Sequence, residues 1–207
     1  MNAMIEIDKK QLTALILAGG KSSRMEGNDK GLLQINNKYI IQYLHSLAEK
    51  FCTDVLVNVN KNVDQYNDLG FNTCEDLMTG FQGPLAGMYT GLHESKTEYL
   101  ITLPCDGPFI DESYFKKMIL LDKESDINVA FDGKRLQPVY CLIRKGMSKS
   151  LESFLHSGER KIDKWFDSCS IHHVDFSNNE DLFININSEE DLNKYKNRIE
   201  TILSNNG

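Results

Sequence analysis

The feature that most constrains the fold is a short, mostly apolar run from Leu12 to Leu17, which ends at Ala18-Gly19-Gly20. A run of this length without polar alternation is typical of a strand that is buried on both faces of a parallel sheet. The two glycines that follow indicate a turn, and the polar residues from Lys21 to Gly31 predict a loop. The chain is therefore expected to begin its core with a buried strand that opens into a polar loop.

Strand-like and helical patterns then alternate along the chain. Helices are predicted at Tyr39 to Phe51, Val63 to Leu69, Pro84 to Ser95, Asp111 to Leu121, Lys145 to His156, Lys161 to Phe166 and Ser188 to Ile202, and further strands at Asp54 to Val59, Phe71 to Cys74, Tyr99 to Leu103, Ile127 to Phe131, Gln137 to Ile143, Ile171 to Asp175 and Leu182 to Ile186. This alternation favours an α/β fold, a three-layer sandwich in which helices cover both faces of a mainly parallel, Rossmann-like twisted sheet.

Size and charge limit the classes of function. The chain has 207 residues, which suits a single domain over residues 1–207. Its net charge of -7 disfavours a nucleic-acid partner, and no apolar run approaches the roughly 20 residues of a membrane span. The five cysteines form no Cys-x-x-Cys pair, so we expect buried, reduced thiols in a cytoplasmic protein.

Two candidate site segments follow directly after predicted strands. Gly19-Gly20 comes after the first strand, and Asp106 comes after the strand at Tyr99 to Leu103. Ligands of parallel sheets bind outside the carboxyl ends of the strands. The two segments are therefore expected to be neighbours on one edge of the sheet.

The loop from Leu17 to Lys30 has the chemistry of a phosphate-binding site. Two glycines let the backbone approach a ligand, and exposed backbone N–H groups can then form an anion-binding concavity. Arg24 and Lys30 add positive charge, so the loop suits a triphosphate. The glycine spacing matches neither a Walker loop nor a GxGxxG fingerprint. The competing interpretation is a plain turn with solvated basic residues. The complete string from Leu17 to Lys30 makes this interpretation the weaker of the two.

This string resembles the opening motif, approximately LAGGxSxRMGGxDK, of the molybdenum cofactor guanylyltransferases within the nucleotidyltransferase superfamily. Glu26 stands where that family usually has the first glycine of its second pair. Further segments are similar to later motifs of the family: Val57-Asn58-Val59-Asn60, Cys74-Glu75-Asp76, Gly83-Pro84-Leu85-Ala86-Gly87-Met88, Pro104-Cys105-Asp106-Gly107-Pro108-Phe109, Ser157-Gly158-Glu159-Arg160-Lys161 and Phe183-Ile184-Asn185-Ile186-Asn187. The similarity spans roughly Leu12 to Leu192.

The resemblance implies a set of site residues. Asp106 is expected to bind Mg²⁺, because a carboxylate facing a triphosphate is a hard oxygen ligand. Asp106, Lys30 and Arg24 are the candidate catalytic residues. GTP is expected to contact Leu17, Ala18, Gly19, Lys30, Asn58, Asp76 and Asp106.

The acceptor substrate is expected on the side of the C-terminal half. Arg160, Lys161, Asn185 and Asn187 are its candidate contacts, and the two asparagines are expected on one face of a strand. Solvated surface charge is an equally strong interpretation of the basic pair.

The function implied by the resemblance is transfer of GMP from GTP to the phosphate of molybdenum-molybdopterin, giving molybdopterin guanine dinucleotide and pyrophosphate. The expected partners are GTP, the molybdenum-molybdopterin acceptor, and proteins that deliver the pterin or receive the product. Alternatives are CMP transfer to molybdopterin, activation of a sugar or alditol phosphate, and a nucleotide-binding module without catalysis.

Overall fold

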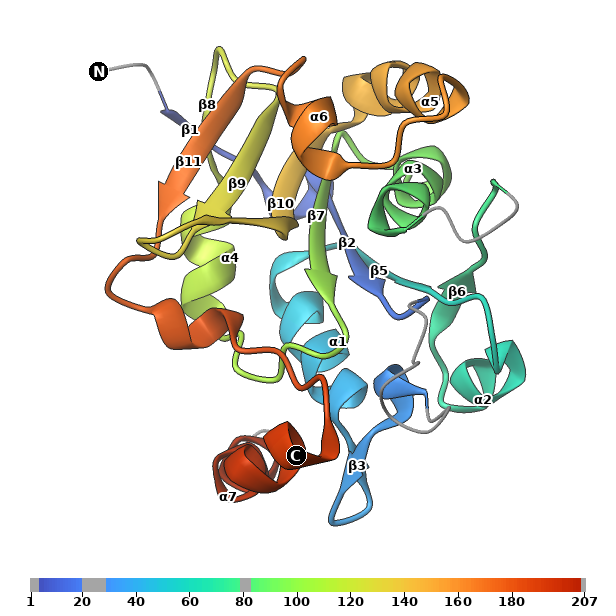
Figure 1. Cartoon of the computed structure of the whole chain (residues 1–207), viewed down its shortest axis with the longest axis vertical. Coiled ribbons are helices and arrows are strands. Elements are labelled where there is room, and N and C mark those ends of the chain that lie inside the picture. The colour runs from blue at the N-terminus through green and yellow to red at the C-terminus, as the bar shows by residue number, and fades with distance from the viewer. Residues whose placement is uncertain (1–3, 20–28, 79–82, 206–207) are drawn as a thin grey trace.

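The computed structural model describes residues 4–19, 29–78 and 83–205, and seven strands form its central sheet (Figure 1). In spatial order these are β11 (Ile171–Asp175), β9 (Ile127–Phe131), β10 (Leu136–Arg144), β7 (Tyr99–Pro104), β2 (Leu12–Leu17), β5 (Asp54–Asn58) and β6 (Asn72–Cys74). β10 is antiparallel to both of its neighbours, and the other four pairs are parallel. The predicted mainly parallel sheet is confirmed, and β9 and β10 form an antiparallel hairpin within it.

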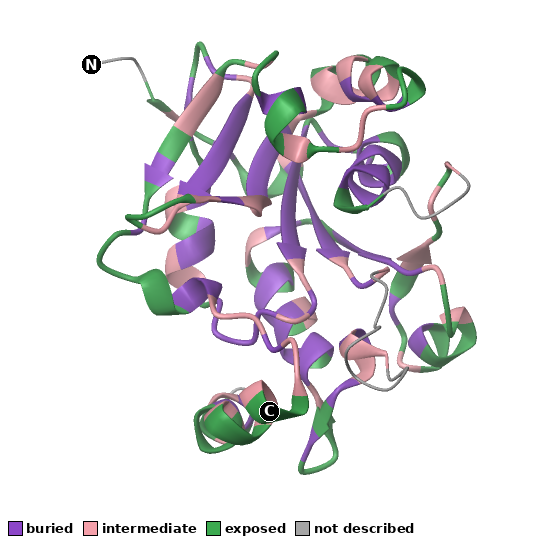
Figure 2. Cartoon of the chain, in the orientation of Figure 1, coloured by how far each residue is buried: buried purple, intermediate pink, exposed green. Residues whose placement is uncertain are grey.

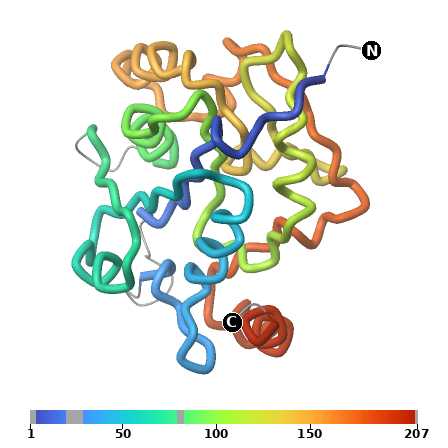
Figure 3. The backbone as a smooth tube through the Cα atoms, turned by 180° about the vertical axis from the view of Figure 1, so that it is seen from behind, coloured from blue at the N-terminus to red at the C-terminus, as the bar shows by residue number. Residues whose placement is uncertain are grey.

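Helices cover both faces of this sheet, so the predicted three-layer α/β fold is also confirmed. One face packs against α1 (Ile40–Phe51) and α4 (Glu112–Met118), which lie toward the viewer in Figure 3. The opposite face packs against α3 (Pro84–Glu94), α5 (Ser148–His156) and α6 (Ile162–Phe166).

Alternation along β2 explains the two cores. Ala14 and Ile16 belong to the core beneath α1, whereas Leu15 between them belongs to the core beneath α3. Successive side chains of a strand point to opposite faces, so a strand that is covered on both sides must be apolar throughout. Figure 2 shows β2 and β7 buried along most of their length.

Two peripheral elements complete the frame around the carboxyl edge. α2 (Val63–Asp68) lies beside β6, and α7 (Glu189–Asn205) packs on a small hairpin formed by β3 (Gln34–Ile35) and β4 (Lys38–Tyr39). Lys38 donates to the backbone oxygen of Leu203 over 2.9 Å, which ties that hairpin to α7.

One helix is shorter than predicted. Asp111 caps α4 as expected, since its carboxylate accepts from the backbone N–H of Ser113 at 2.8 Å. The helix ends at Met118, however, and Leu120–Asp122 forms β8, which pairs with β1 (Met4–Glu6). The prediction of helix as far as Leu121 is wrong because pairing with the N-terminal strand outweighs the helical pattern.

The strand predicted at Leu182 to Ile186 is also wrong. Glu180–Phe183 forms a 3-10 helix, and an extended segment follows it. Leu182 and Phe183 are adjacent yet both buried, which a strand with one covered face cannot achieve. Asn185 therefore lies on an irregular segment, whose Ile186 N–H donates to the backbone oxygen of Asp106 at 2.8 Å.

The described residues contain no helix with the length and apolar character that a membrane crossing requires. All five cysteines are free thiols, as expected, and three of them are buried. Cys74 and Cys169 are only partly buried, so the expectation of burial is wrong for those two.

Candidate active site

A cavity of about 520 Å³ opens at the sheet edge where β2, β5, β6 and β7 end. This volume lies within the range of small-molecule sites. Because β10 is antiparallel, its first residues reach the same edge. The lining residues are Leu17, Ala18, Gly19, Lys30, Asn58, Asn60, Asp76, Gly83, Pro84, Pro104, Cys105, Asp106, Gln137, Pro138, Val139, Tyr140 and Asn185.

Backbone hydrogen bonds continue past the ends of the strands and hold the edge together. The N–H of Ala18 donates to the oxygen of Asn58 over 2.9 Å, and the N–H of Cys105 donates to the oxygen of Leu17 over 3.0 Å. The first loop, the end of β5 and the segment after β7 therefore lie side by side. The predicted proximity of Gly19 and Asp106 on one edge is confirmed, while Gly20 lies outside the described residues.

Two amides hold the Asp76 carboxylate on one side of the cavity. Asn58 donates to one carboxylate oxygen and Asn60 to the other, each over 2.9 Å. The backbone N–H of Asp76 returns a hydrogen bond to the Asn60 side chain, also 2.9 Å. The carboxylate is thereby oriented, yet each of its oxygens keeps further accepting capacity. Sequence reasoning missed Asn60, although its spacing of two residues from Asn58 was a usable signal.

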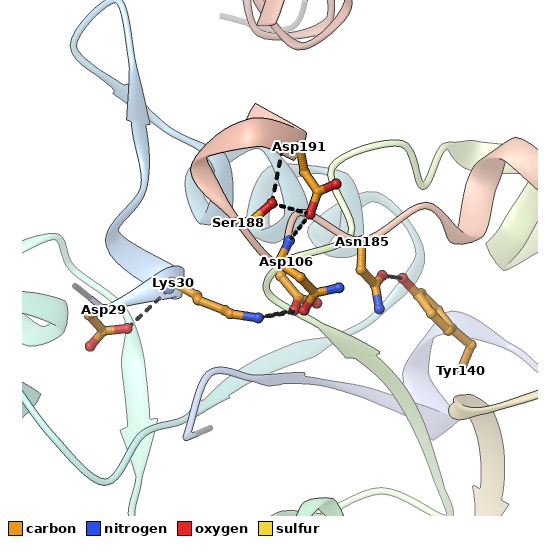
Figure 4. Close-up of polar contacts among 9 residues, drawn as sticks. Asp29, Lys30, Asp106, Tyr140, Asn185, Ser188 and Asp191 are labelled. Carbon is orange, nitrogen blue, oxygen red and sulfur yellow. Dashed lines mark hydrogen bonds and ion pairs between the residues drawn. The ribbon is translucent and has the colours of Figure 1, made fainter. Parts of the chain in front are cut away.

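Lys30 and Asp106 meet at the centre of the site (Figure 4). The Lys30 ammonium lies 3.2 Å from Asp106 Oδ2 and donates to Asn187 Oδ1 over 2.6 Å. The Asp106 side chain is only 14% exposed, and burial raises the pKa of its carboxyl group above the usual value against the opposing effect of Lys30. Within the described part of the chain Lys30 is the cation paired with this buried carboxylate, which is suited to bind further positive charge.

A separate network places Lys30. The Asp29 carboxylate accepts from the Tyr66 hydroxyl at 2.8 Å, from the Gly31 N–H at 3.0 Å and from the Asn62 amide at 3.1 Å. Tyr66 is fully buried on α2. The residue next to Lys30 is therefore bonded to the buried Tyr66 of α2, which positions the ammonium at the cavity.

Gly31 leaves no room for a side chain. A Cβ at this position would lie 2.2 Å from the Tyr66 hydroxyl oxygen. We expect Gly31→Ala to lower the free energy of unfolding by about 1–3 kcal/mol, since overpacking a buried site displaces its neighbours. Gly146→Ala is the matched control, because a Cβ there meets no atom within 4 Å. Urea denaturation measures both, and equal stability of the two variants would contradict this account of the loop.

The acceptor-side candidates separate into two groups. Asn185 lines the cavity, and Asn187 lies beside it through its bond to Lys30. Arg160 and Lys161 do not line it: the Arg160 guanidinium donates to the backbone oxygens of Leu155 at 2.7 Å and Glu159 at 2.6 Å, and the Lys161 side chain is exposed. Arg24 lies outside the described residues.

The first half of the strand β10 supplies residues that line the cavity and that no sequence motif indicated. The side of the cavity opposite Asp76 is lined by Gln137, Pro138, Val139 and Tyr140. In this part of β10, the register with β9 shifts between Gln137 and Cys141. A bulge of this kind changes the direction in which side chains point, and its position depends on strand pairing rather than on local sequence.

The site fits a single-carboxylate magnesium position. The described residues contain no group of three histidine, cysteine or acidic side chains that could hold a metal ion. Mg²⁺ is nevertheless commonly bound by one or two carboxylates together with substrate phosphates and water. Asp106 is a hard oxygen donor that lines the cavity, so it would hold the ion jointly with a bound triphosphate.

Comparison with known proteins agrees with this geometry. The family model described as "MobA-like NTP transferase domain" matches residues 14–174. Two curated proteins called molybdenum cofactor guanylyltransferase, from Shewanella halifaxensis and Shewanella pealeana, are 38% and 37% identical over 182 residues, which is 87% of this chain and 91% of each relative.

Solved structures share the fold. The molybdopterin-guanine dinucleotide biosynthesis protein A of Archaeoglobus fulgidus superposes with a TM-score of 0.73 at 19% identity, over 93% of this chain and 99% of that one. The inositol-1-phosphate CTP transferase of T. maritima superposes with a TM-score of 0.69 at 16% identity, over 96% and 98%. With most of its length matched by the family model and by relatives above 30% identity, this chain belongs to the MobA-like NTP transferase family and is a nucleotidyltransferase.

Proposed function

We propose that this enzyme transfers GMP from GTP to the phosphate of molybdenum-molybdopterin and releases pyrophosphate. The observation that carries the proposal is the convergence of Lys30, Asp106 and the amide-held Asp76 in one cavity at the sheet edge. The name of the curated relatives, molybdenum cofactor guanylyltransferase, supports guanine as the base and molybdopterin as the acceptor.

The reaction needs alignment more than acid–base chemistry. A phosphate oxygen of the acceptor forms a bond to the α-phosphorus of GTP, while the bond from that phosphorus to the oxygen bridging to the β-phosphate breaks and pyrophosphate leaves. The attacking phosphate is already anionic near neutral pH, so no side chain has to remove a proton. Lys30 neutralises charge on the triphosphate, and Leu17, Ala18 and Gly19 hold the nucleoside through their backbone.

Asp106 has a separate task. When bound to this carboxylate, Mg²⁺ supplies neutralising charge to phosphate oxygens. The carboxylate fixes where that charge can lie, and its ion pair with Lys30 keeps both groups aligned in the free enzyme. We propose Arg24 as a further cation toward the triphosphate, and Arg160, Lys161, Asn185 and Asn187 as contacts to the acceptor.

Base selection is proposed to rest on Asp76 and Asn58. A carboxylate accepts from both N1–H and the exocyclic amine of guanine, whereas adenine has no matching pair of donors. Asn58 and Asn60 orient the Asp76 oxygens through their 2.9 Å bonds, so the carboxylate can accept without rearrangement. We propose that the N-terminal half of the chain binds the nucleotide and that the C-terminal half binds the acceptor.

Nucleotide selectivity is measured by thermal-shift titration with GTP, ATP, CTP and UTP, each with Mg²⁺. A ligand that binds only the folded state at 100 times its Kd raises the midpoint of a chain of this size by about 5–10 °C. We expect GTP alone to produce this shift. A shift with CTP would indicate CMP transfer to molybdopterin or to an alditol phosphate. If none of the four nucleotides shifts the midpoint, both the proposed function and a nucleotide-binding module without catalysis are contradicted.

The same titration tests the role of Asp76. Asp76→Asn retains the size of the side chain but replaces an accepting oxygen by a donor, so we expect the preference for GTP over ATP to fall about 10- to 100-fold. Glu75→Gln is the control, because Glu75 is the exposed neighbouring carboxylate and does not line the cavity. Unchanged selectivity in Asp76→Asn would move base recognition to other groups.

We propose a cytoplasmic location for this activity. The five free thiols suit a reducing compartment. Proteins that deliver molybdopterin or receive the dinucleotide cofactor are proposed as further partners.

A further inference from the structure

We propose that Tyr140 is a positioning residue that fixes the side-chain amide of Asn185, so that its NH₂ group faces a phosphate oxygen of the acceptor. The proposal rests on the proposed function for the identity of that acceptor. It assigns a task to a residue that belongs to none of the sequence motifs discussed above.

The Tyr140 ring has a single, enclosed position. The residue is 1% exposed, and its ring packs edge-on against Tyr114 and Phe183, with centroid distances of 5.8 and 5.0 Å. It lies within the register shift of β10, between Gln137 and Cys141, and lines the cavity. A ring held in this way fixes the location of its hydroxyl group.

That hydroxyl orients Asn185. Tyr140 donates to Asn185 Oδ1 over 2.9 Å, and a carbonyl oxygen can only accept, so the phenol supplies the proton. Burial holds the pKa of Tyr140 well above its usual value, which keeps the phenol protonated. Figure 4 shows the Asn185 oxygen facing Tyr140 and the amide nitrogen turned away from it.

The backbone at Asp106 and Gly107 lies close to both Tyr140 and Asn185. A Cβ on Gly107 would lie 2.2 Å from the Tyr140 hydroxyl oxygen and 3.4 Å from Asn185 Oδ1. On the other side, the N–H of Ile186 donates to the backbone oxygen of Asp106 at 2.8 Å. Asn185 is thus held next to Asp106, where the reacting phosphates are proposed to meet.

The direction of the amide matters because its two ends have opposite polarity. With the carbonyl held by Tyr140, the NH₂ group of Asn185 meets no acceptor among the residues that the structure describes, so it can donate to an anionic oxygen. Without the hydroxyl group, the amide can turn and present its oxygen, which repels a phosphate. The misoriented amide loses a hydrogen bond to a charged oxygen, so we expect roughly tenfold weaker phosphate binding without the correct orientation.

The first experiment compares Tyr140→Phe with the wild-type enzyme in steady-state GMP transfer. We expect the KM for the acceptor to rise about tenfold, with the KM for GTP unchanged and kcat altered less than about twofold. Tyr114→Phe is the matched control. It also removes a buried hydroxyl, one that donates to the oxygen of Thr102 over 2.7 Å, but Tyr114 does not line the cavity. We expect it to cost stability and to leave the acceptor KM unchanged.

A second measurement does not need turnover. In ¹⁵N-labelled enzyme saturated with GTP, the side-chain amide signal of Asn185, assigned with Asn185→Ala, is followed while inorganic phosphate is added. We expect this signal to shift in the wild type and the apparent Kd for phosphate to rise about tenfold in Tyr140→Phe. Asn185→Ala should weaken acceptor binding by a similar factor, and adding Tyr140→Phe to it should have no further effect.

These results separate the two proposals. A tenfold loss confined to the acceptor and to phosphate supports the role of Tyr140. An unresponsive Asn185 amide in the wild type, equal phosphate binding in Tyr140→Phe, or an additive double variant overturns it. If phosphate binding depends on Tyr140 but the wild type transfers no GMP to molybdopterin, the proposed function fails and the positioning role stands.

Discussion

Asp106→Asn is expected to reduce GMP transfer by about a thousandfold while the protein remains folded. The amide has the size of the carboxylate but lacks its charge, so it can neither form an ion pair with Lys30 nor serve as the proposed metal ligand beside the triphosphate. The measurement is single-turnover transfer at saturating GTP, with circular dichroism as the check on folding. Turnover within tenfold of the wild type would remove Asp106 from the catalytic groups.

The same substitution is expected to retain or raise thermal stability. Burial raises the pKa of Asp106 in the folded state, so the folded chain binds this proton more tightly than the unfolded chain does. A group with a raised folded pKa contributes stability at low pH that is lost as the pH rises through that value. At a pH above that raised value the charged carboxylate therefore opposes folding, and a neutral asparagine does not. A clearly lower midpoint at pH 8 for Asp106→Asn would contradict this view of the buried charge.

Lys30→Gln is expected to lower the second-order rate constant for GTP by about a hundredfold. The variant loses the positive charge that lies 3.2 Å from Asp106 Oδ2 and that donates to Asn187 Oδ1 over 2.6 Å. Lys30→Arg should recover little, because a forked guanidinium does not fit the position of a compact ammonium.

Lys38→Gln is the control for Lys30. Lys38 lies on the neighbouring hairpin, donates to the backbone oxygen of Leu203 and does not line the cavity. Steady-state kinetics with varied GTP compare the two variants. Equal effects of the two substitutions would show that the loss follows general surface charge rather than the site.

Most of the fold was predictable because its core strands are buried on both faces. Both Leu12–Leu17 and Tyr99–Pro104 are apolar almost throughout. Each run is recognised as a strand rather than a helix because it is short and is followed by helix-breaking residues. The carboxyl ends of parallel strands meet at one edge of the sheet, and this predicts that Gly19 lies near Asp106.

The mispredicted segments depend on distant contacts. Leu120–Asp122 becomes a strand only because Met4–Glu6 pairs with it from the other end of the chain. Phe183 points inward because its ring packs against the rings of Tyr140 and Phe176. The local sequence pattern around Leu182 to Ile186 does not indicate these contacts.

The site was predictable to the extent that its residues follow strands in recognisable strings. Asp106, Lys30, Asn58 and Asp76 belong to such strings, and the structure places all four around one cavity. Tyr140 lies in the middle of a strand, and its position depends on a register shift in β10 that the sequence does not show.

The most direct test of the central claim follows the α-phosphate of GTP. Enzyme, GTP labelled at the α-phosphate, Mg²⁺ and molybdenum-loaded molybdopterin are incubated, and the products are separated. If the enzyme transfers GMP to molybdopterin, we expect the label to move into a pterin dinucleotide in a one-to-one ratio with released pyrophosphate. We expect CTP to give no comparable product. Transfer of CMP under the same conditions, or consumption of GTP without a labelled dinucleotide, would contradict the central claim.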